Sequence, residues 1–162
     1  MRLQGKIALV TGASHGIGQA TAVALAREGA KVAVNYNASK EGAEETLRRI
    51  KEAGGEGVSF QADMGEVEQI QRLVASTVER FGRLDLYVNN ANAGRRGRDL
   101  PRNYLEVQPD QIYQEYFLPY RACYLGGQAA AKRMIEQGGG GAIVNITSVH
   151  QARSWPNDSL YG

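Results

Sequence analysis

The sequence predicts an α/β protein with a doubly wound parallel sheet, and two patterns along its 162 residues predict this class. Short apolar and β-branched runs alternate with longer stretches in which apolar residues recur at helical spacing. This alternation is typical of parallel strands joined by crossover helices. A glycine-rich turn also lies between the first predicted strand and the first predicted helix, which suits a sharp change of chain direction there.

The first strand-helix-strand unit is expected within residues 6–36. Lys6 to Thr11 and Lys31 to Tyr36 are predicted strands, because both are mostly apolar and β-branched. The segment Gly16 to Glu28 has helical periodicity. Gly29 should end this helix, because glycine readily adopts the left-handed conformation that closes many helices.

The same alternation continues to the end of the chain. The remaining strands are expected at Val58 to Ala62, Leu84 to Asn90 and Ala142 to Thr147. The helices before the third and fourth strands are marked by Ala43, Leu47 and Ile50 and by Val67, Ile70, Val74, Val78 and Phe81. The last strand is apolar along its length, so we expect other elements to cover both of its faces.

A long helix is predicted over Gln111 to Gln137, followed by a turn at Gly138 to Gly141. Pro119 should kink or delay this helix, because proline has no backbone N–H to donate. The stretch Asn92 to Pro109 is too irregular for a regular element and is expected to be a solvated basic loop. Its basic residues include Arg95, Arg96, Arg98 and Arg102. Residues 1–162 should form a single domain.

Composition and charge exclude several classes of protein. The net charge is +2, with 19 basic and 17 acidic residues mixed along the chain, so no strong field favours nucleic acid or a membrane surface. Cys123 is the single cysteine, so no internal disulfide can form. The N-terminus lacks the apolar core of a signal peptide, and no window approaches the roughly 18 apolar residues that span a bilayer. We expect a cytoplasmic protein without metal, nucleic acid or membrane partners.

The glycine-rich turn is the first candidate site. Glycines let the backbone approach a pyrophosphate, and the unpaired N–H groups of the following helix favour its negative charge. An ordinary strand-to-helix turn is the alternative, but the position after a strand and before a helix favours a dinucleotide. The candidate residues are Gly12, Ser14, His15, Gly16, Ile17 and Gly18.

The spacing TGxxxGxG from Thr11 to Gly18 resembles that of the short-chain dehydrogenase/reductase family and differs from the GxGxxG of other dinucleotide-binding folds. The resemblance covers the whole chain. It implies a Rossmann-type sheet in the order 3-2-1-4-5 and a single dinucleotide-binding domain over residues 1–162 that lacks the family's C-terminal part. It also implies that Asp63, beside Met64, meets the adenine, the alternative being that Asp63 only caps the next helix.

The segment Val88-Asn89-Asn90-Ala91 resembles the family's NNAG motif, which supports the sheet and lines the cofactor. The resemblance assigns Asn90 and Ala91 to the cofactor site. Asn92 stands where the family has glycine, and the sequence reads NNANAG, so either the glycine is replaced or the motif is extended. A side chain therefore occupies a position that the family leaves open.

The residues after the second strand favour NADP, with NAD as the alternative. An acid there would hydrogen-bond the ribose hydroxyls and repel a 2′-phosphate, but Asn35 to Lys40 contains no acid. Tyr36 and Asn37 are assigned to the cofactor, and His15 lies where NADP enzymes of the family often carry a base. Lys40 is equally consistent with a solvated residue at the start of the next helix.

The resemblance implies that Ser148 and Tyr161 are catalytic, since their separation matches that of the family's serine and tyrosine. The tyrosine hydroxyl would give a proton to a carbonyl oxygen that the serine holds, as hydride arrives from the nicotinamide. The family's lysine, four residues after the tyrosine, would lie beyond Gly162. An unassisted tyrosine ionises near pH 10, so at pH 7 only about one in a thousand is ionised.

Two further expectations concern features of the family that this sequence lacks. Pro119 occupies the position of a proton-relaying asparagine of the family, and proline cannot replace that side chain. The chain is expected to be a fragment, or to be completed by a partner chain or by its own copies as a homo-oligomer.

The stretch around Ser148, His150 and Trp155 resembles glucose 1-dehydrogenases of the family. It favours a sugar or polyol among small carbonyl and alcohol substrates, although His150 and Trp155 are equally consistent with packing. The predicted function is an NAD(P)-dependent oxidoreductase. The alternative is a non-catalytic nucleotide-binding or interaction protein derived from that family.

Overall fold

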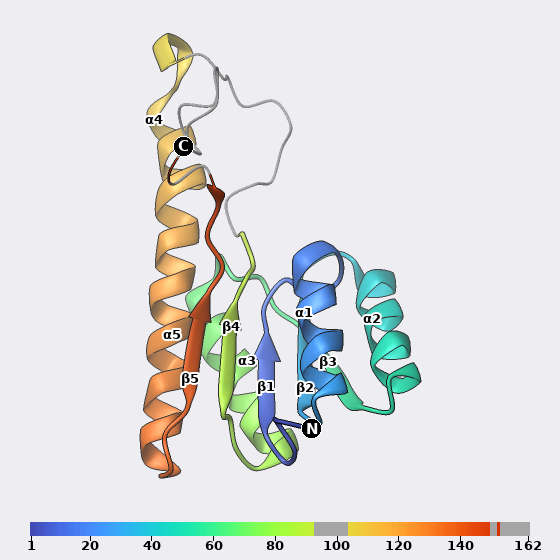
Figure 1. The fold of residues 1–162 in the computed structure, drawn as a ribbon. Coiled ribbons are helices and arrows are strands. Elements are labelled where there is room, and N and C mark those ends of the chain that lie inside the picture. The colour runs from blue at the N-terminus through green and yellow to red at the C-terminus, as the bar shows by residue number, and fades with distance from the viewer. Residues whose placement is uncertain (93–103, 150–151, 153–162) are drawn as a thin grey trace.

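The computed structural model describes residues 1–92, 104–149 and 152 (Figure 1). Five strands form one parallel sheet in the order β3-β2-β1-β4-β5, which confirms the order that the family resemblance implied. The strands are β1 (Ile7–Val10), β2 (Lys31–Tyr36), β3 (Glu56–Gln61), β4 (Leu86–Asn89) and β5 (Ala142–Asn145). The main helices are α1 (Gly16–Arg27), α2 (Lys40–Glu52), α3 (Val67–Phe81) and α5 (Leu118–Glu136).

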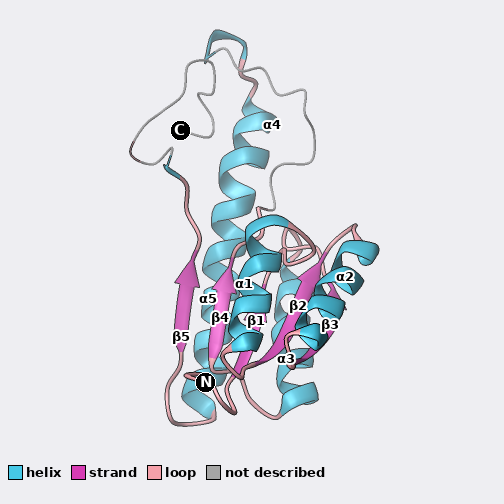
Figure 2. Ribbon diagram, turned by 45° about the vertical axis from the view of Figure 1, so that its right-hand side comes forward, coloured by secondary structure: helices cyan, strands magenta, loops and turns pink. Residues whose placement is uncertain are grey.

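Helices cover both faces of the sheet, with α1 and α2 on one side and α3 and α5 on the other (Figure 2). Successive side chains of a strand point to opposite faces, and the two cores follow this rule. In β1, Ala8 and Val10 pack with α1 and α2, whereas Leu9 between them packs with α3 and α5. The continuous apolar runs that predicted the strands are therefore the mark of a sheet buried on both faces.

Element boundaries differ from the sequence predictions by a few residues. The strand β1 is shorter at both ends than predicted, and β3 begins earlier, at Glu56. Helix α1 ends as expected, since Gly29 follows it with φ +94°. The strand β4 begins at Leu86 rather than Leu84, because the ladder with β1 starts at Leu86 and Leu84 and Asp85 precede it.

The predicted long helix is divided in the structure. A short helix α4 (Pro109–Ile112) leads into one π-helical segment (Tyr113–Phe117) and then into α5. Pro119 lies in the first turn of α5, where its missing N–H costs least. The wider π-helical turn before Pro119 delays the start of α5, as the proline led us to expect. Part of the predicted irregular loop is also ordered, since Tyr104–Glu106 form a 3-10 helix, whereas the arginines at positions 95, 96, 98 and 102 lie outside the described residues.

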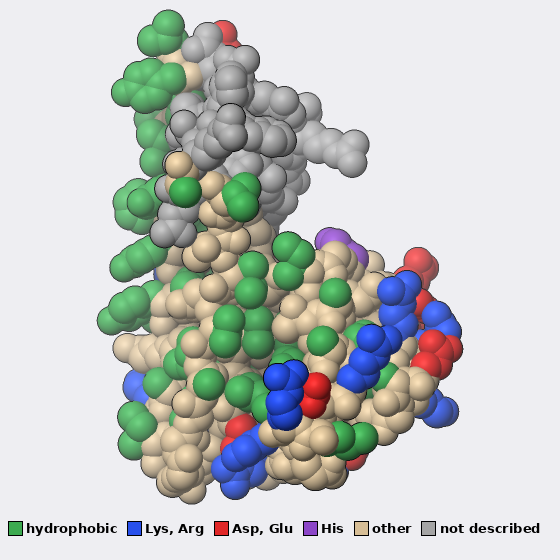
Figure 3. Space-filling model, in the orientation of Figure 1, with side chains coloured by type: hydrophobic (Ala, Val, Ile, Leu, Met, Phe, Trp, Pro, Cys, Tyr) green, Lys and Arg blue, Asp and Glu red, His purple; other side chains and the backbone are tan. Residues whose placement is uncertain are grey.

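The outer side of β5 and much of α5 carry exposed apolar side chains. Ile143 and Val144 of β5 are 40% and 46% exposed, so the expectation that both faces of this strand are covered is wrong for the part of the chain that the structure describes. Hydrophobic side chains also follow the edge of the molecule formed by α5 and the residues before it (Figure 3). They include Tyr113, Tyr116, Phe117, Tyr120, Tyr124 and Ile135. This surface is defined here as the α5 face.

No helix of the described residues is both long and apolar enough to cross a bilayer. Within the same part of the chain, no three His, Cys, Asp or Glu side chains are grouped so that they could hold a metal ion.

Asp85 ties the amino-terminal ends of three strands together. Its side chain is 5% exposed, accepts a hydrogen bond from the Ile7 N–H at 2.9 Å and is paired with Arg83 at 2.7 Å and Lys6 at 3.6 Å. Its backbone carbonyl accepts from the Ala142 N–H at the start of β5. Burial opposes ionisation of this carboxyl, but the Arg83 and Ile7 hydrogen bonds and the two positive charges outweigh it and lower its pKa.

We therefore expect acid to weaken the fold through Asp85. A carboxyl whose pKa is lower in the folded chain stabilises the fold above its unfolded pKa of about 3.9, and this contribution is lost as the pH falls further. Asp85→Asn should cost about 2 kcal/mol at pH 7, since an amide keeps one acceptor but loses both ion pairs. Urea unfolding of the wild type and of the variant at pH 7 and at pH 3 measures the cost of the substitution at each pH. An equal loss of stability at the two pH values would contradict the ion-pair argument.

Candidate functional site

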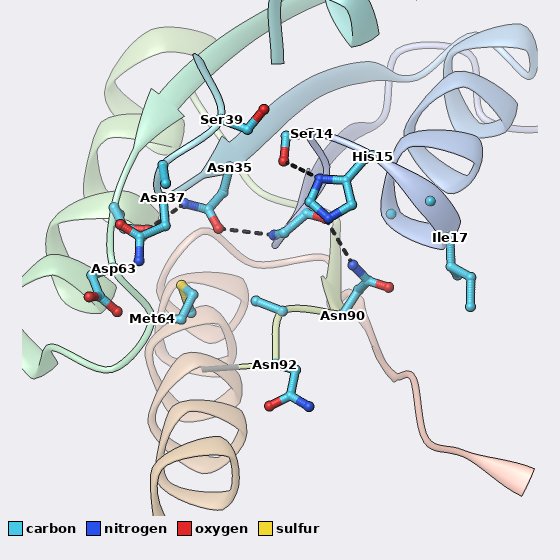
Figure 4. A pocket seen from close by; sticks show the side chains of 16 residues that line it. Ser14, His15, Ile17, Asn35, Asn37, Ser39, Asp63, Met64, Asn90 and Asn92 are labelled. Atoms are coloured by element: carbon cyan, nitrogen blue, oxygen red, sulfur yellow. Dashed lines mark hydrogen bonds between the residues drawn. The ribbon is translucent and has the colours of Figure 1, made fainter. Parts of the chain in front are cut away.

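A pocket of about 530 Å³ lies at the carboxyl-terminal ends of the strands β1 to β4 (Figure 4). Ligands of open parallel sheets bind at this edge, and the volume is ordinary for a small-molecule site. The pocket is lined by Gly12, Ser14, His15, Gly16, Ile17, Gly18, Asn35, Asn37, Ala38, Ser39, Ala62, Asp63, Met64, Asn90, Ala91 and Asn92.

The end of β4 holds the glycine-rich turn in place. The Thr11 hydroxyl donates to the Val88 carbonyl at 3.3 Å and accepts from the N–H groups of Asn90 and Ala91 at 2.9 and 3.0 Å. The Asn90 amide in turn donates to the carbonyls of Thr11 and Gly12 at 2.9 and 3.1 Å. The two motifs that the sequence singled out, around Gly12 and around Asn90, are therefore one hydrogen-bonded unit.

This close contact explains two of the glycines. A Cβ on Gly12 would lie 2.9 Å from the Ala91 Cα, and the residue has φ +61°, a conformation that L side chains rarely adopt. A Cβ on Gly18 would lie 2.5 Å from both the Asn90 amide nitrogen and the Gly12 carbonyl oxygen. Larger residues at these two positions would separate the turn from β4.

Asn35, in β2, supports the same turn from the opposite side. Its side-chain oxygen accepts from the Gly12 N–H at 3.0 Å, and its backbone carbonyl accepts from the Ala13 N–H at 2.8 Å. Figure 4 shows the amide directed toward the turn. The sequence indicated neutral donors after β2. It did not indicate that the Asn35 side chain is hydrogen-bonded to the glycine turn.

Helix α2 is fastened to the turn by Thr46, which the sequence reasoning missed. Its hydroxyl lies 2.8 Å from the Ala13 carbonyl and accepts from the Gln19 amide at 2.9 Å. Thr46 is fully buried, and its position between Ala43 and Ile50 places a hydroxyl on the apolar stripe of α2. A polar residue on a buried stripe is the signal that could have identified it, because buried hydroxyl groups need partners.

The α2 side of the pocket is made by residues after β2. Asn37 and Ser39 line it, and the Ser39 hydroxyl accepts from the Gly42 N–H at 3.2 Å as the N-cap of α2. Tyr36 is not among the lining residues. Its ring is buried in the core beneath α1 and α2. Lys40 opens α2 and is paired with Glu44 at 3.8 Å, which agrees with its solvated interpretation.

The β3 side of the pocket is made by Ala62, Asp63 and Met64. The Asp63 carboxylate accepts from the Gly65 N–H at 2.8 Å, so it orders the turn before α3. The helix itself begins later, with Glu66 as its N-cap residue. In the glycine turn, the Ser14 hydroxyl and the exposed His15 ring lie in hydrogen-bond contact at 2.9 Å.

The predicted catalytic residues are only partly described. Ser148 is half-buried and follows β5 by three residues, at the same end of the sheet, but it does not line the pocket. Before it, the Asn145 side-chain oxygen lies 3.5 Å from the Asn89 amide and 3.4 Å from the Cys123 sulfur. Tyr161, His150 and Trp155 lie outside the described residues.

The donors of the pocket fit an anionic, elongated ligand. Gly16 has open space where a Cβ would be, and it begins a helix whose first N–H groups lack intrahelical partners. Asp63 is the one carboxylate among the lining residues, and it lies beyond the end of β3, across the sheet from the turn. The chemistry of these residues suits a phosphate near α1 and a base and ribose toward β2 and β3.

The fold and the pocket define an α/β protein of the Rossmann type with the form of a nucleotide site. The chain belongs to the short-chain dehydrogenase family, whose sequence profile matches residues 6–162. It is 38% identical to glucose 1-dehydrogenase 2 of Bacillus subtilis over 164 residues, covering 98% of this chain and 60% of that protein.

Solved structures of the family superpose closely on the chain. A short chain dehydrogenase from Burkholderia cenocepacia in complex with NADP has a TM-score of 0.83 and 37% identity, with coverage of 96% of this chain and 60% of that one. NAD⁺-bound xylitol dehydrogenase has a TM-score of 0.88 and 31% identity, with coverage of 100% and 60%. The chain thus spans about 60% of the length of these relatives.

Proposed function

We propose that the chain is the nucleotide-binding part of an NAD(P)-dependent oxidoreductase that interconverts a carbonyl and an alcohol. The observation that carries this proposal is the hydrogen-bonded unit of the glycine turn and the β4 end, placed beside a pocket open toward α2 and β3. Family membership supports it, as do two solved relatives, one in complex with NADP and one bound to NAD⁺.

Within this proposal, each side of the pocket has one task. The N–H groups at the start of α1 bind the pyrophosphate, and Asp63 and Met64 bind the adenine. Asn90 and Ala91 line the path toward the nicotinamide. When bound, the nicotinamide supplies or accepts the hydride.

We further propose that NADP is preferred to NAD. No acidic side chain lines the pocket between β2 and α2, where Asn37 and Ser39 present an amide and a hydroxyl group, and His15 lines the pocket from the glycine turn. A carboxylate there would repel a 2′-phosphate, whereas amide, hydroxyl and imidazole groups hydrogen-bond it.

The proposed catalytic step uses Ser148 and Tyr161. The serine hydroxyl holds the substrate oxygen, and the tyrosine hydroxyl donates its proton to that oxygen during reduction, or accepts the alcohol proton as tyrosinate in the reverse direction. Sugars and polyols are the proposed substrates, on the basis of the similarity to glucose 1-dehydrogenase around Ser148. Their hydroxyl groups would need polar partners beyond those of the described pocket.

Partners are proposed on the same basis. The exposed side of β5 and the α5 face leave apolar area open, and patches of this kind mark contacts with other protein. A homo-oligomer or a completing chain would cover them.

Titration with NADPH tests the proposal directly. We expect the fluorescence of NADPH to change on binding, with NADPH bound at least about tenfold more tightly than NADH, which corresponds to about 1.4 kcal/mol. The absence of binding at millimolar NADPH would contradict the nucleotide site, and tighter binding of NADH would contradict the NADP preference. Turnover with glucose or xylitol then separates the enzyme from a protein that only binds nucleotide.

A further inference from the structure

Asn35 is a buried polar residue among those that line the pocket. It belongs to β2, the strand that lies between β1 and β3 in the sheet, and its side chain is only 1% exposed. Burying an amide side chain costs free energy unless its N–H donors and its oxygen acceptor form hydrogen bonds. Its partners therefore indicate why a polar side chain lies buried near the carboxyl-terminal end of β2.

The partners of Asn35 lie on two different sides of the pocket. On the β1 side, it accepts from the N–H groups of Gly12 and Ala13, as described above. On the β3 side, the side-chain nitrogen donates to the Ala62 carbonyl at 3.1 Å and lies 3.4 Å from the Phe60 carbonyl. Ala62 directly precedes Asp63, so one amide group joins the glycine turn to the proposed adenine side.

These contacts also restrict which groups can meet a phosphate. The N–H groups of Gly12 and Ala13 are already bound by Asn35, so neither is free to donate to a ligand. The phosphate must be met by later N–H groups of the turn and of α1. The helix fixes the arrangement of these groups among themselves, whereas Asn35 holds the start of the turn relative to the β3 side of the pocket.

We propose that Asn35 is a positioning residue that sets the distance between the pyrophosphate side and the adenosine side of the pocket. The proposal rests on the proposed nucleotide-binding function. A dinucleotide contacts both sides at once, so its affinity depends on their relative position, whereas a ligand of one side does not sense the other. Asn35 acts through the two backbone segments that its side chain joins.

Asn35→Leu tests this role, because leucine has nearly the shape of asparagine but neither donor nor acceptor. Three probes are titrated by NMR into wild type and variant: NADPH for both sides, 2′-AMP for the adenosine side and inorganic pyrophosphate for the turn. We expect NADPH to bind about tenfold more weakly to the variant, the loss of one to two buried hydrogen bonds. The affinities of 2′-AMP and pyrophosphate should change by less than about twofold. Amide hydrogen exchange should show faster exchange at Gly12.

Thr77→Val is the matched control. The Thr77 hydroxyl is fully buried and bound to the Leu73 carbonyl inside α3, outside the residues that line the pocket. This variant should lose stability but keep the affinity for all three probes. Where Asn35→Leu does not fold, Asn35→Ser replaces it, since serine keeps a polar group but cannot reach both sides.

The outcomes separate the two proposals. Equal NADPH affinity of a folded Asn35 variant and wild type would contradict the positioning role, as would proportional losses for all three probes. A wild-type chain that binds none of the probes would instead contradict the proposed function itself. Unchanged exchange at Gly12 would show that the hydrogen bond to Asn35 does not hold the turn.

Discussion

Replacing Gly18 by alanine is expected to reduce NADPH affinity by at least about 100-fold, which corresponds to about 3 kcal/mol. The added Cβ would lie 2.5 Å from both the Asn90 amide and the Gly12 carbonyl oxygen. Both neighbours belong to the unit that holds the glycine turn, so neither can move without breaking the hydrogen bonds between Asn90 and the turn. Fluorescence titration with NADPH measures the effect, and circular dichroism establishes that the variant is folded.

Gly127→Ala is the control for this substitution. Gly127 also lies inside a helix, α5, but a Cβ there would meet nothing within 4 Å. Its substitution should leave NADPH affinity unchanged. Retention of wild-type affinity by Gly18→Ala would contradict the close packing of α1 against Asn90 as a requirement of the site.

The second large effect is expected at Gly126, the residue that precedes Gly127 in α5. A Cβ on Gly126 would overlap the hydroxyl oxygen of Tyr87, whose side chain is fully buried in β4. Among the described residues this hydroxyl has no hydrogen-bond partner, and burial raises the pKa of Tyr87. Gly126→Ala should therefore cost about 3 kcal/mol through overpacking, measured by urea unfolding.

The adjacent position should respond in the opposite direction. Gly127→Ala is expected to stabilise the chain by about 0.5–1 kcal/mol, because alanine is the better helix former and the added methyl group has room. Adding Tyr87→Leu to Gly126→Ala should recover a large part of the loss, since leucine removes the hydroxyl. If the double variant is as unstable as the sum of its single variants, the contact with Tyr87 is not the cause.

Much of the fold follows from local pattern. The alternation of apolar runs and helical stripes located every strand of the sheet, and Gly29 was predicted as the end of α1 for a conformational reason that the structure confirms. These features depend on residues near one another in sequence, so periodicity and glycine position are sufficient to identify them. The effect of Pro119 on the long helix was predicted in the same way, although the π-helical form of the delay was not.

The hydrogen bonds that build the pocket required tertiary structure. Nothing in the sequence indicates that the Asn35 side chain is bound to Gly12 and Ala62 while Asn37 lines the pocket after β2, because these contacts depend on strand order and on the course of the chain beyond the strand. Tyr36 and Thr46 illustrate the same limit. The first was assigned to the cofactor and lies in the core, and the second was overlooked and holds the turn.

The sequence by itself determined the fold class, the order of the elements and the family, since these depend on periodicity and on glycines at fixed spacing. The tertiary structure decided which polar side chains support the site and which line it. It also decided how much space surrounds Gly126 and Gly127. The sequence does not distinguish these two adjacent glycines, but a Cβ has room only at Gly127. Contacts between distant segments depend on how sheet and helices pack, and a pattern along one chain does not contain that information.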